Sequence, residues 1–246
     1  MDSRTKPTLA PVTFTYDWYR GFLDWLQETG FTFRTVSEGV ESGTVLLRHD
    51  VDLSLQKALT TARIEAERGV SATYCVLLTS PLYNPFERSN RERLHAIEAL
   101  GHEVGLHCST HEYWDADNEP TAAELHARVE QELTALGTTL STTPEAVSFH
   151  VPPEWVLGRP FDAFENTYGP AFFEDIAYVA DSGQRWRETP PSIPDPPASA
   201  QVLTHPGLYG ETDSRFETRV EQSVTEACRH ADRKAHLEFL SEVDDA

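Results

Sequence analysis

The chain has 246 residues, 39% of them hydrophobic, and a formal net charge of −20. This length suits one large domain and is enough to bury a core without disulfides. Forty acidic residues against twenty Lys and Arg exclude the basic surface that nucleic acids and anionic membranes require. The three cysteines, Cys75, Cys108 and Cys228, contain no CxxC pair and predict no disulfide framework.

Strands and helices alternate in the first half of the chain. Ser54 and Gly69 are plausible caps of one predicted helix, and Pro120 and Gly137 mark the ends of another. The predicted elements, in chain order, are helix 16–29, strand 44–49, helix 54–68, strand 70–78, helix 89–100, strand 103–107 and helix 120–136.

The second half continues this alternation less regularly. Strands are predicted near 146–150, 176–180 and 201–204, and a helix at 213–240. Residues 189–198 contain five prolines and predict a loop. Alternating strands and helices favour a parallel sheet with crossover helices.

Residues able to perform chemistry follow several of the predicted strands. Active sites of parallel barrels and open α/β sheets lie at the carboxyl ends of their strands. The residues at or just past such ends are Asp50, Asp52, His107, His150, Asp181 and His205.

Two of these segments predict a metal site. Asp50 and Asp52 are two residues apart on a strand, so they share a face, and their repulsion calls for a metal or another cation. His107 and His111 are four apart, and a helical turn over 108–111 would project both rings to one side. One carboxylate and two imidazoles leave coordination positions open, as catalytic zinc sites do. The alternatives are a solvated loop and a pair of surface histidines.

These two motifs resemble those of the NodB-like polysaccharide deacetylases, carbohydrate esterase family four. The resemblance implies that Asp50 is the catalytic base and that Asp52, His107 and His111 hold the metal. The segment Gly101–Gly105 resembles the usual lead-in to the second motif.

The remaining family motifs are matched less closely. Residues 148–153 only loosely match the third motif. His150 and Val151 stand near where the family often has Arg, so Arg48 or Arg185 would supply the cation beside the base. The fourth and fifth motifs resemble segments 180–186 and 202–205. They imply His205 as general acid, helped by Asp181. A histidine that simply caps a strand is the alternative for His205.

Four residues are candidates for substrate binding. Trp114 and Trp186 would stack on sugar rings, and the alternative is that they are buried. Arg185 would bind an anionic group, and a salt bridge with one of the forty acids is its alternative. His150 completes the set through the third motif.

The resemblance implies an α/β fold, an incomplete, distorted parallel β/α barrel of the polysaccharide-deacetylase type. We expect one catalytic domain over 1–246 with an N-terminal helical extension at about 1–40. The cofactor would be one divalent metal, Zn²⁺ first, with Co²⁺ or Ni²⁺ possible.

The implied function is metal-dependent removal of an acyl group, acetyl first, from an amide nitrogen of a carbohydrate. The alternatives are an amidohydrolase acting on a non-sugar amide and a catalytically idle, metal-bearing domain that binds glycans or a partner. The partner would be an N-acylated saccharide or sugar conjugate, with no nucleic acid; the sequence does not indicate the oligomeric state.

The start of the chain lacks the apolar segment of a signal peptide, and no stretch approaches the length of a membrane span. We therefore expect a cytoplasmic location. That location favours a nucleotide-linked or lipid-linked sugar, or a small saccharide, as substrate.

The charge composition predicts a dependence on salt. The chain has only three lysines, and acid-rich, lysine-poor surfaces resemble those of salt-loving organisms, where salt screens the repulsion. A merely acidic protein is the alternative. If the protein is halophilic, its midpoint of thermal unfolding rises between low salt and molar KCl, by at least roughly 2–4 °C, which corresponds to about 1 kcal/mol at this size. Circular dichroism melts measure this, and equal midpoints would contradict it.

Overall fold

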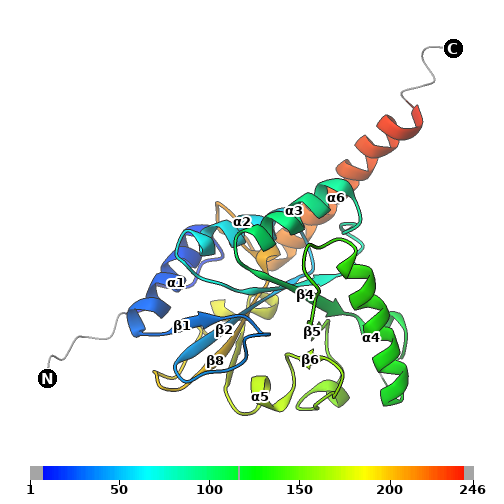
Figure 1. Ribbon diagram of the computed structural model, residues 1–246. Coiled ribbons are helices and arrows are strands. Elements are labelled where there is room, and N and C mark those ends of the chain that lie inside the picture. Colours follow the sequence, from blue (N-terminus) through cyan, green and yellow to red (C-terminus); the bar gives the residue numbers. More distant parts are fainter. Residues whose placement is uncertain (1–7, 116, 241–246) are drawn as a thin grey trace, which may run out of the picture.

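The computed structural model describes residues 8–115 and 117–240. Its centre is one sheet with strand order β6-β5-β4-β3-β2-β8-β7, and β1 pairs with the first half of β2. All the pairings are parallel. The sheet is open and curls into a half-barrel (Figure 1), which confirms the predicted incomplete β/α barrel. The strands are β1 Thr32–Arg34, β2 Thr44–Val51, β3 Thr73–Leu77, β4 Glu103–Cys108, β5 Ala146–Phe149, β6 Glu165–Asn166, β7 Ala177–Ala180 and β8 Ala200–Thr204.

Helices cover the sheet, and α1, α2 and α3 lie together along one side of it in Figure 1. The C-terminal part of α6 extends away from the body and continues into a π-helical segment, His236–Leu240. The helices are α1 Tyr16–Thr29, α2 Leu55–Ala66, α3 Arg88–Ala99, α4 Ala122–Gly137, α5 Pro170–Phe173 and α6 Phe216–Ala235.

Local capping explains where several helices begin and end. The hydroxyl of Thr15 accepts a hydrogen bond from the amide of Trp18, and Gly30 ends α1 in the left-handed conformation with φ 104°. Ser54 caps α2 as predicted. The short elements β1, β6 and α5 were not predicted, because two to four residues carry no periodic signal. Residues 1–7 of the predicted N-terminal extension lie outside the described residues.

A buried charge pair lies at the centre of the fold, on β2, which is buried along its whole length. Nε and Nη2 of Arg48 donate to the two carboxylate oxygens of Asp50, at 3.0 and 2.8 Å. Nη1 also donates to Thr167 and Gln201, and Nη2 to the hydroxyl of Tyr168. The guanidinium therefore links β2 to β8 and to the segment after β6. Its five hydrogen bonds compensate for removing the charge from water.

The opposite face of β2 is occupied by a second polar cluster. The carboxylate of Glu65, on α2, accepts hydrogen bonds from His49 at 2.7 Å, Tyr19 at 2.5 Å and Tyr74 at 2.6 Å. His102 lies beside it and bonds to the carbonyl of Ala62. These bonds hold α2 on the sheet, so His49 and His102 belong to the scaffold rather than to the carboxyl edge of the strands.

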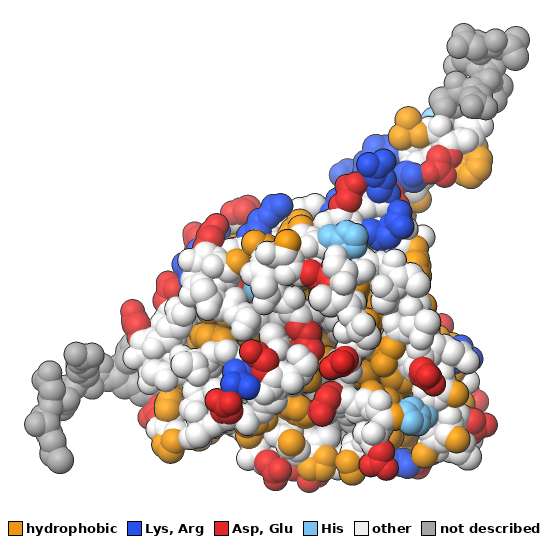
Figure 2. Space-filling model, in the orientation of Figure 1, with side chains coloured by type: hydrophobic (Ala, Val, Ile, Leu, Met, Phe, Trp, Pro, Cys, Tyr) orange, Lys and Arg blue, Asp and Glu red, His pale blue; other side chains and the backbone are white. Residues whose placement is uncertain are grey.

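Charged side chains are unevenly distributed over the surface. Figure 2 shows acidic side chains scattered over the body, whereas Lys and Arg gather where α6 leaves it. The excess of dispersed carboxylates is the charge distribution on which the predicted salt dependence rests.

We predict that Arg48→Met destabilises the protein by roughly 3–5 kcal/mol, because it leaves the Asp50 carboxylate buried without its cation. Urea unfolding measures this loss. The matched control is Arg88→Met, which breaks the exposed pair with Glu92 and costs about 1 kcal/mol or less. A loss for Arg48→Met no larger than that of the control would refute a central role for the pair.

Candidate metal centre and acid–base pair

Four polar side chains converge where neighbouring strands end. Asp52 follows β2, His107 lies near the end of β4, His150 follows β5 and His205 follows β8. These strands are neighbours or next neighbours in the sheet, so their carboxyl ends meet at one edge. The fold thus brings together residues that lie up to 153 positions apart in the chain.

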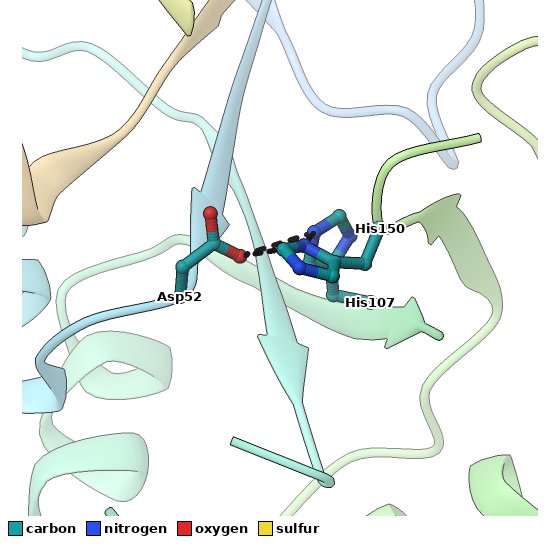
Figure 3. Close-up of side chains that lie close together, drawn as sticks. All are labelled: Asp52, His107 and His150. Carbon is teal, nitrogen blue, oxygen red and sulfur yellow. Dashed lines mark hydrogen bonds and ion pairs between the residues drawn. The ribbon is translucent and has the colours of Figure 1, made fainter. Parts of the chain in front are cut away.

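Asp52, His107 and His150 form a compact triangle of potential ligand atoms (Figure 3). Oδ1 of Asp52 lies 3.2 Å from Nε2 of His107 and 3.3 Å from Nδ1 of His150, and the two nitrogens are 3.2 Å apart. Ligands about 2.0–2.2 Å from a tetrahedral zinc ion are separated by roughly 3.3–3.5 Å. The triangle therefore matches one face of such a coordination shell.

The hydrogen bonding of these atoms also fits a metal. Oδ1 of Asp52 is buried and has no hydrogen-bond partner, although two imidazole nitrogens lie near it. An unpartnered buried carboxylate oxygen is costly unless a cation compensates for it. The three residues can therefore hold a divalent ion, and one carboxylate with two imidazoles suits zinc and similar ions.

A chain of hydrogen bonds sets the tautomer of His107. The hydroxyl of Ser148 donates to Oδ1 of Asp50 at 3.1 Å, because an ionised carboxylate only accepts. The Ser148 oxygen must then accept the proton of Nδ1 of His107, 2.5 Å away. Nε2 of His107 then carries no proton, and its lone pair is directed at Asp52 and His150. An imidazole nitrogen without a proton is the form that binds metals.

Asp50 therefore lies behind His107 and not beside Asp52. Burial alone would raise the pKa of Asp50, but the charge of Arg48 outweighs it and holds that pKa below its usual value. The carboxylate is 2% exposed. Arg48, one of the two expected cations, is the one that pairs with it, and Arg185 does not take part. The role of Asp50 as catalytic base remains a prediction.

His111 lies outside the triangle, although its spacing predicted a metal ligand. The strand β4 continues through Cys108, and a 3-10 turn over Thr110–Glu112 follows, so no helical turn aligns His107 with His111. Nε2 of His111 instead donates to the carbonyl of Val151 at 2.8 Å, and its side chain is exposed. His150, expected to bind substrate, stands in the triangle; its place after a strand was the signal for it.

His205 and Asp181 form an ion pair at the same edge. Nδ1 of His205 bonds to Oδ1 of Asp181 at 2.6 Å, and the hydroxyl of Tyr209 donates to Oδ2. Burial alone would lower the pKa of His205. The charge and hydrogen bond of Asp181 outweigh this effect and raise the pKa to about 9. Nε2 lies 3.8 Å from Oδ2 of Asp52. The structure thus joins the two residues predicted to act as an acid pair.

The other predicted substrate-binding residues have other partners in the structure. Trp186 is 2% exposed and packs against Trp18 and Phe22 in the core. Trp114 packs against Tyr113, and the exposed Arg185 bonds to the carbonyl of Ser182. The alternative of burial describes Trp186, whereas Trp114 is only half-buried and its stacking on a sugar stays a prediction. Aromatic residues in sequence carry no signal that separates core packing from stacking on a ligand.

A pocket of about 350 Å³ borders the triangle and is lined by Asp52, His150 and His205 among others. A substrate in it would contact both the candidate metal ligands and the raised-pKa histidine.

No protein-family model matches the chain, and no curated protein matches it. Solved structures do match. One is a pseudoenzyme of carbohydrate esterase family four from Bacillus anthracis, at 15% identity and a TM-score of 0.42, covering 76% of this chain and 60% of that one. A family 4 carbohydrate esterase from Bacillus anthracis matches at 14% identity and a TM-score of 0.40, covering 85% of this chain and 86% of that one. Another family 4 carbohydrate esterase, from Streptomyces lividans in complex with acetate, matches at 15% identity and a TM-score of 0.39, covering 76% of this chain and 88% of that one.

All three belong to carbohydrate esterase family four, the family whose motifs this sequence resembles. The chain spans about three fifths of the length of the first of them. Likeness at these identities and TM-scores carries no argument about activity, so the function proposed below rests on the geometry of the site.

The titration of His205 provides a test of the acid pair. Because its folded-state pKa is raised, the pair stabilises the fold below the ordinary pKa of about 6.5, and this contribution is lost as the pH rises through about 9. We predict an NMR titration of His205 with a midpoint near 9 in metal-free protein and a midpoint well below it in Asp181→Asn. An unchanged midpoint in the variant would exclude Asp181 as the cause.

Proposed function

We propose that the protein is a metal-dependent hydrolase that removes an acyl group, acetyl first, from an amide nitrogen of a carbohydrate. The observation that carries this proposal is the Asp52–His107–His150 triangle, which borders a pocket together with the His205–Asp181 pair. Three protein ligands leave room for water and substrate, whereas structural zinc sites are closed by four.

A divalent ion held by the triangle would act as a Lewis acid toward the acyl carbonyl and a water molecule. The residues of the chain supply the rest. Asp50, through Ser148, keeps Nε2 of His107 free to bind the ion. We infer this orienting role for Asp50 from its contact with the far side of the His107 ring.

Proton transfer falls to His205. The water oxygen bonds to the acyl carbon, and the carbon–nitrogen bond breaks as His205 donates its Nε2 proton to the departing nitrogen. Of the two protons of the water, one restores His205 and the other passes to the released amine, so that the products are a carboxylate and a protonated amine. The raised pKa keeps His205 protonated at neutral pH, as a general acid requires.

A non-sugar amide is the second candidate substrate. The tryptophans expected to stack on a sugar ring do not line the pocket, which favours considering other amides. No helix within the described residues is long and apolar enough to cross a membrane. The cytoplasmic location and the halophilic origin stay predictions.

We predict that the protein, purified without chelator, contains about one divalent ion per chain and releases acetate from N-acetylated sugars. His150→Ala should lose the ion and reduce kcat/KM by at least roughly 10²-fold, whereas His111→Ala should keep the ion. Mass spectrometry measures the metal content, and a coupled acetate assay measures turnover.

The two histidine variants distinguish the structure from the sequence spacing. Loss of the ion in His111→Ala and retention in His150→Ala would restore the spacing-based ligand set and refute the triangle. An ion retained by the wild type without turnover of any sugar or non-sugar amide would refute the enzymatic proposal and favour the idle binding domain.

A further inference from the structure

The pocket beside the candidate metal centre is apolar apart from the side chains that would perform the chemistry. Its polar side chains are Asp52, His150 and His205. The large apolar side chains around them are Leu53, Leu77, Leu82, Leu208, Val151 and Phe216.

These apolar residues come from separate parts of the chain. Leu53 follows β2 and Leu77 ends β3, whereas Leu208 follows β8 and Phe216 begins α6. Leu77 and Leu208 are 5% and 2% exposed, so the surrounding fold holds them in place. The lining is thus apolar and comes from four places around the edge that carries the candidate chemistry. Sites that bind apolar groups of a ligand are usually lined in this way.

Val151 stands out on the exposed edge of this pocket. Its φ is +44°, a left-handed conformation that a β-branched residue rarely adopts, and its side chain is 64% exposed. The hydrogen bond from His111 to its carbonyl holds the segment in this shape. Strained conformations cluster at functional sites, where the surrounding structure maintains them. Here the strained residue is one that lines the pocket.

Phe216, from another segment of the chain, is a second exposed apolar side chain at this pocket. This first residue of α6 is 39% exposed, although a phenylalanine normally buries its ring. Val151 and Phe216 thus add exposed apolar surface to the rim of this pocket, and a ligand bound there would cover both.

We propose that this pocket binds the aliphatic chain of an acyl group longer than acetyl, so that the substrate is an N-acyl amide with a chain of roughly four to eight carbons. This inference rests on the proposed amide hydrolysis. A volume of about 350 Å³ exceeds what an acetyl group needs, and the apolar lining offers a sugar ring few hydrogen-bond partners. The acyl carbonyl would lie at the triangle and the chain against Leu53, Leu82 and Val151.

The first test measures binding, which needs no turnover. Calorimetry would follow acetate, butanoate, hexanoate and octanoate binding to the protein, both as purified and after loading with zinc. We expect the affinity to rise by up to roughly fourfold per methylene as the chain is buried. We also expect an increasingly negative heat-capacity change. Equal affinity for acetate and octanoate would overturn the proposal.

Variants locate the binding surface. Val151→Asn replaces the apolar side chain by one that tolerates a positive φ, and Phe216→Gln removes the ring at the helix start. Together they should reduce the rise per methylene to less than twofold. The matched control is Leu157→Gln, an apolar residue that is 38% exposed and is not among the residues lining the pocket. A rise that persists in the double variant would overturn the assignment of the surface.

Hydrolysis then separates this inference from the proposed function. N-acetylglucosamine and N-hexanoylglucosamine would be compared with the zinc-loaded protein. A higher kcat/KM for the hexanoyl compound supports both proposals, and a higher value for the acetyl compound overturns the inference alone. If neither is hydrolysed, the proposed function fails for these sugars, and the binding series decides the inference.

Discussion

The buried pair of Arg48 and Asp50 is the interaction on which the rest of the site depends. The carboxylate of Asp50, only 2% exposed, stays ionised because the fully buried guanidinium of Arg48 donates a hydrogen bond to each of its oxygens. Since that carboxylate can only accept, Ser148 must donate to it and in turn accept the proton of His107. One charge in the half-barrel thus determines that the nitrogen of His107 facing Asp52 and His150 is the one without a proton.

Alternation along β2 lets one strand serve two purposes. Arg48 and Asp50 point into the half-barrel, while His49 between them points to Glu65 on α2. The first set of contacts prepares the candidate metal ligands, and the second holds the covering helix on the sheet. A shift of β2 by one residue in register would place its charged side chains on the wrong face of the sheet.

The chemistry and the pocket lining support each other. A ligand that covered the apolar walls would displace water from them and strengthen the electrostatic interactions of Asp52 and of the His205–Asp181 pair. His111, which the turn after β4 places outside the Asp52–His107–His150 triangle, donates a hydrogen bond to the carbonyl of Val151 at the edge of that pocket. A histidine that resembles a metal ligand in sequence is thus hydrogen-bonded in the structure to a residue that lines the pocket.

The sequence alone determined the alternation of strands and helices, the parallel half-barrel and the gathering of Asp52, His107, His150, Asp181 and His205 at strand ends. Local periodicity and the carboxyl-end rule suffice for the alternation and for the gathering at strand ends, whereas the half-barrel was expected from the resemblance of the motifs to the deacetylase family. The tertiary structure alone decided that His150 rather than His111 completes the triangle. The register of β4 and β5, with His107 opposite Ser148, carries His150 to the site, whereas His111 follows a turn whose shape no spacing predicts. It also decided between Arg48 and Arg185, and it buried Trp186, because long-range packing chooses among residues that are equivalent in sequence.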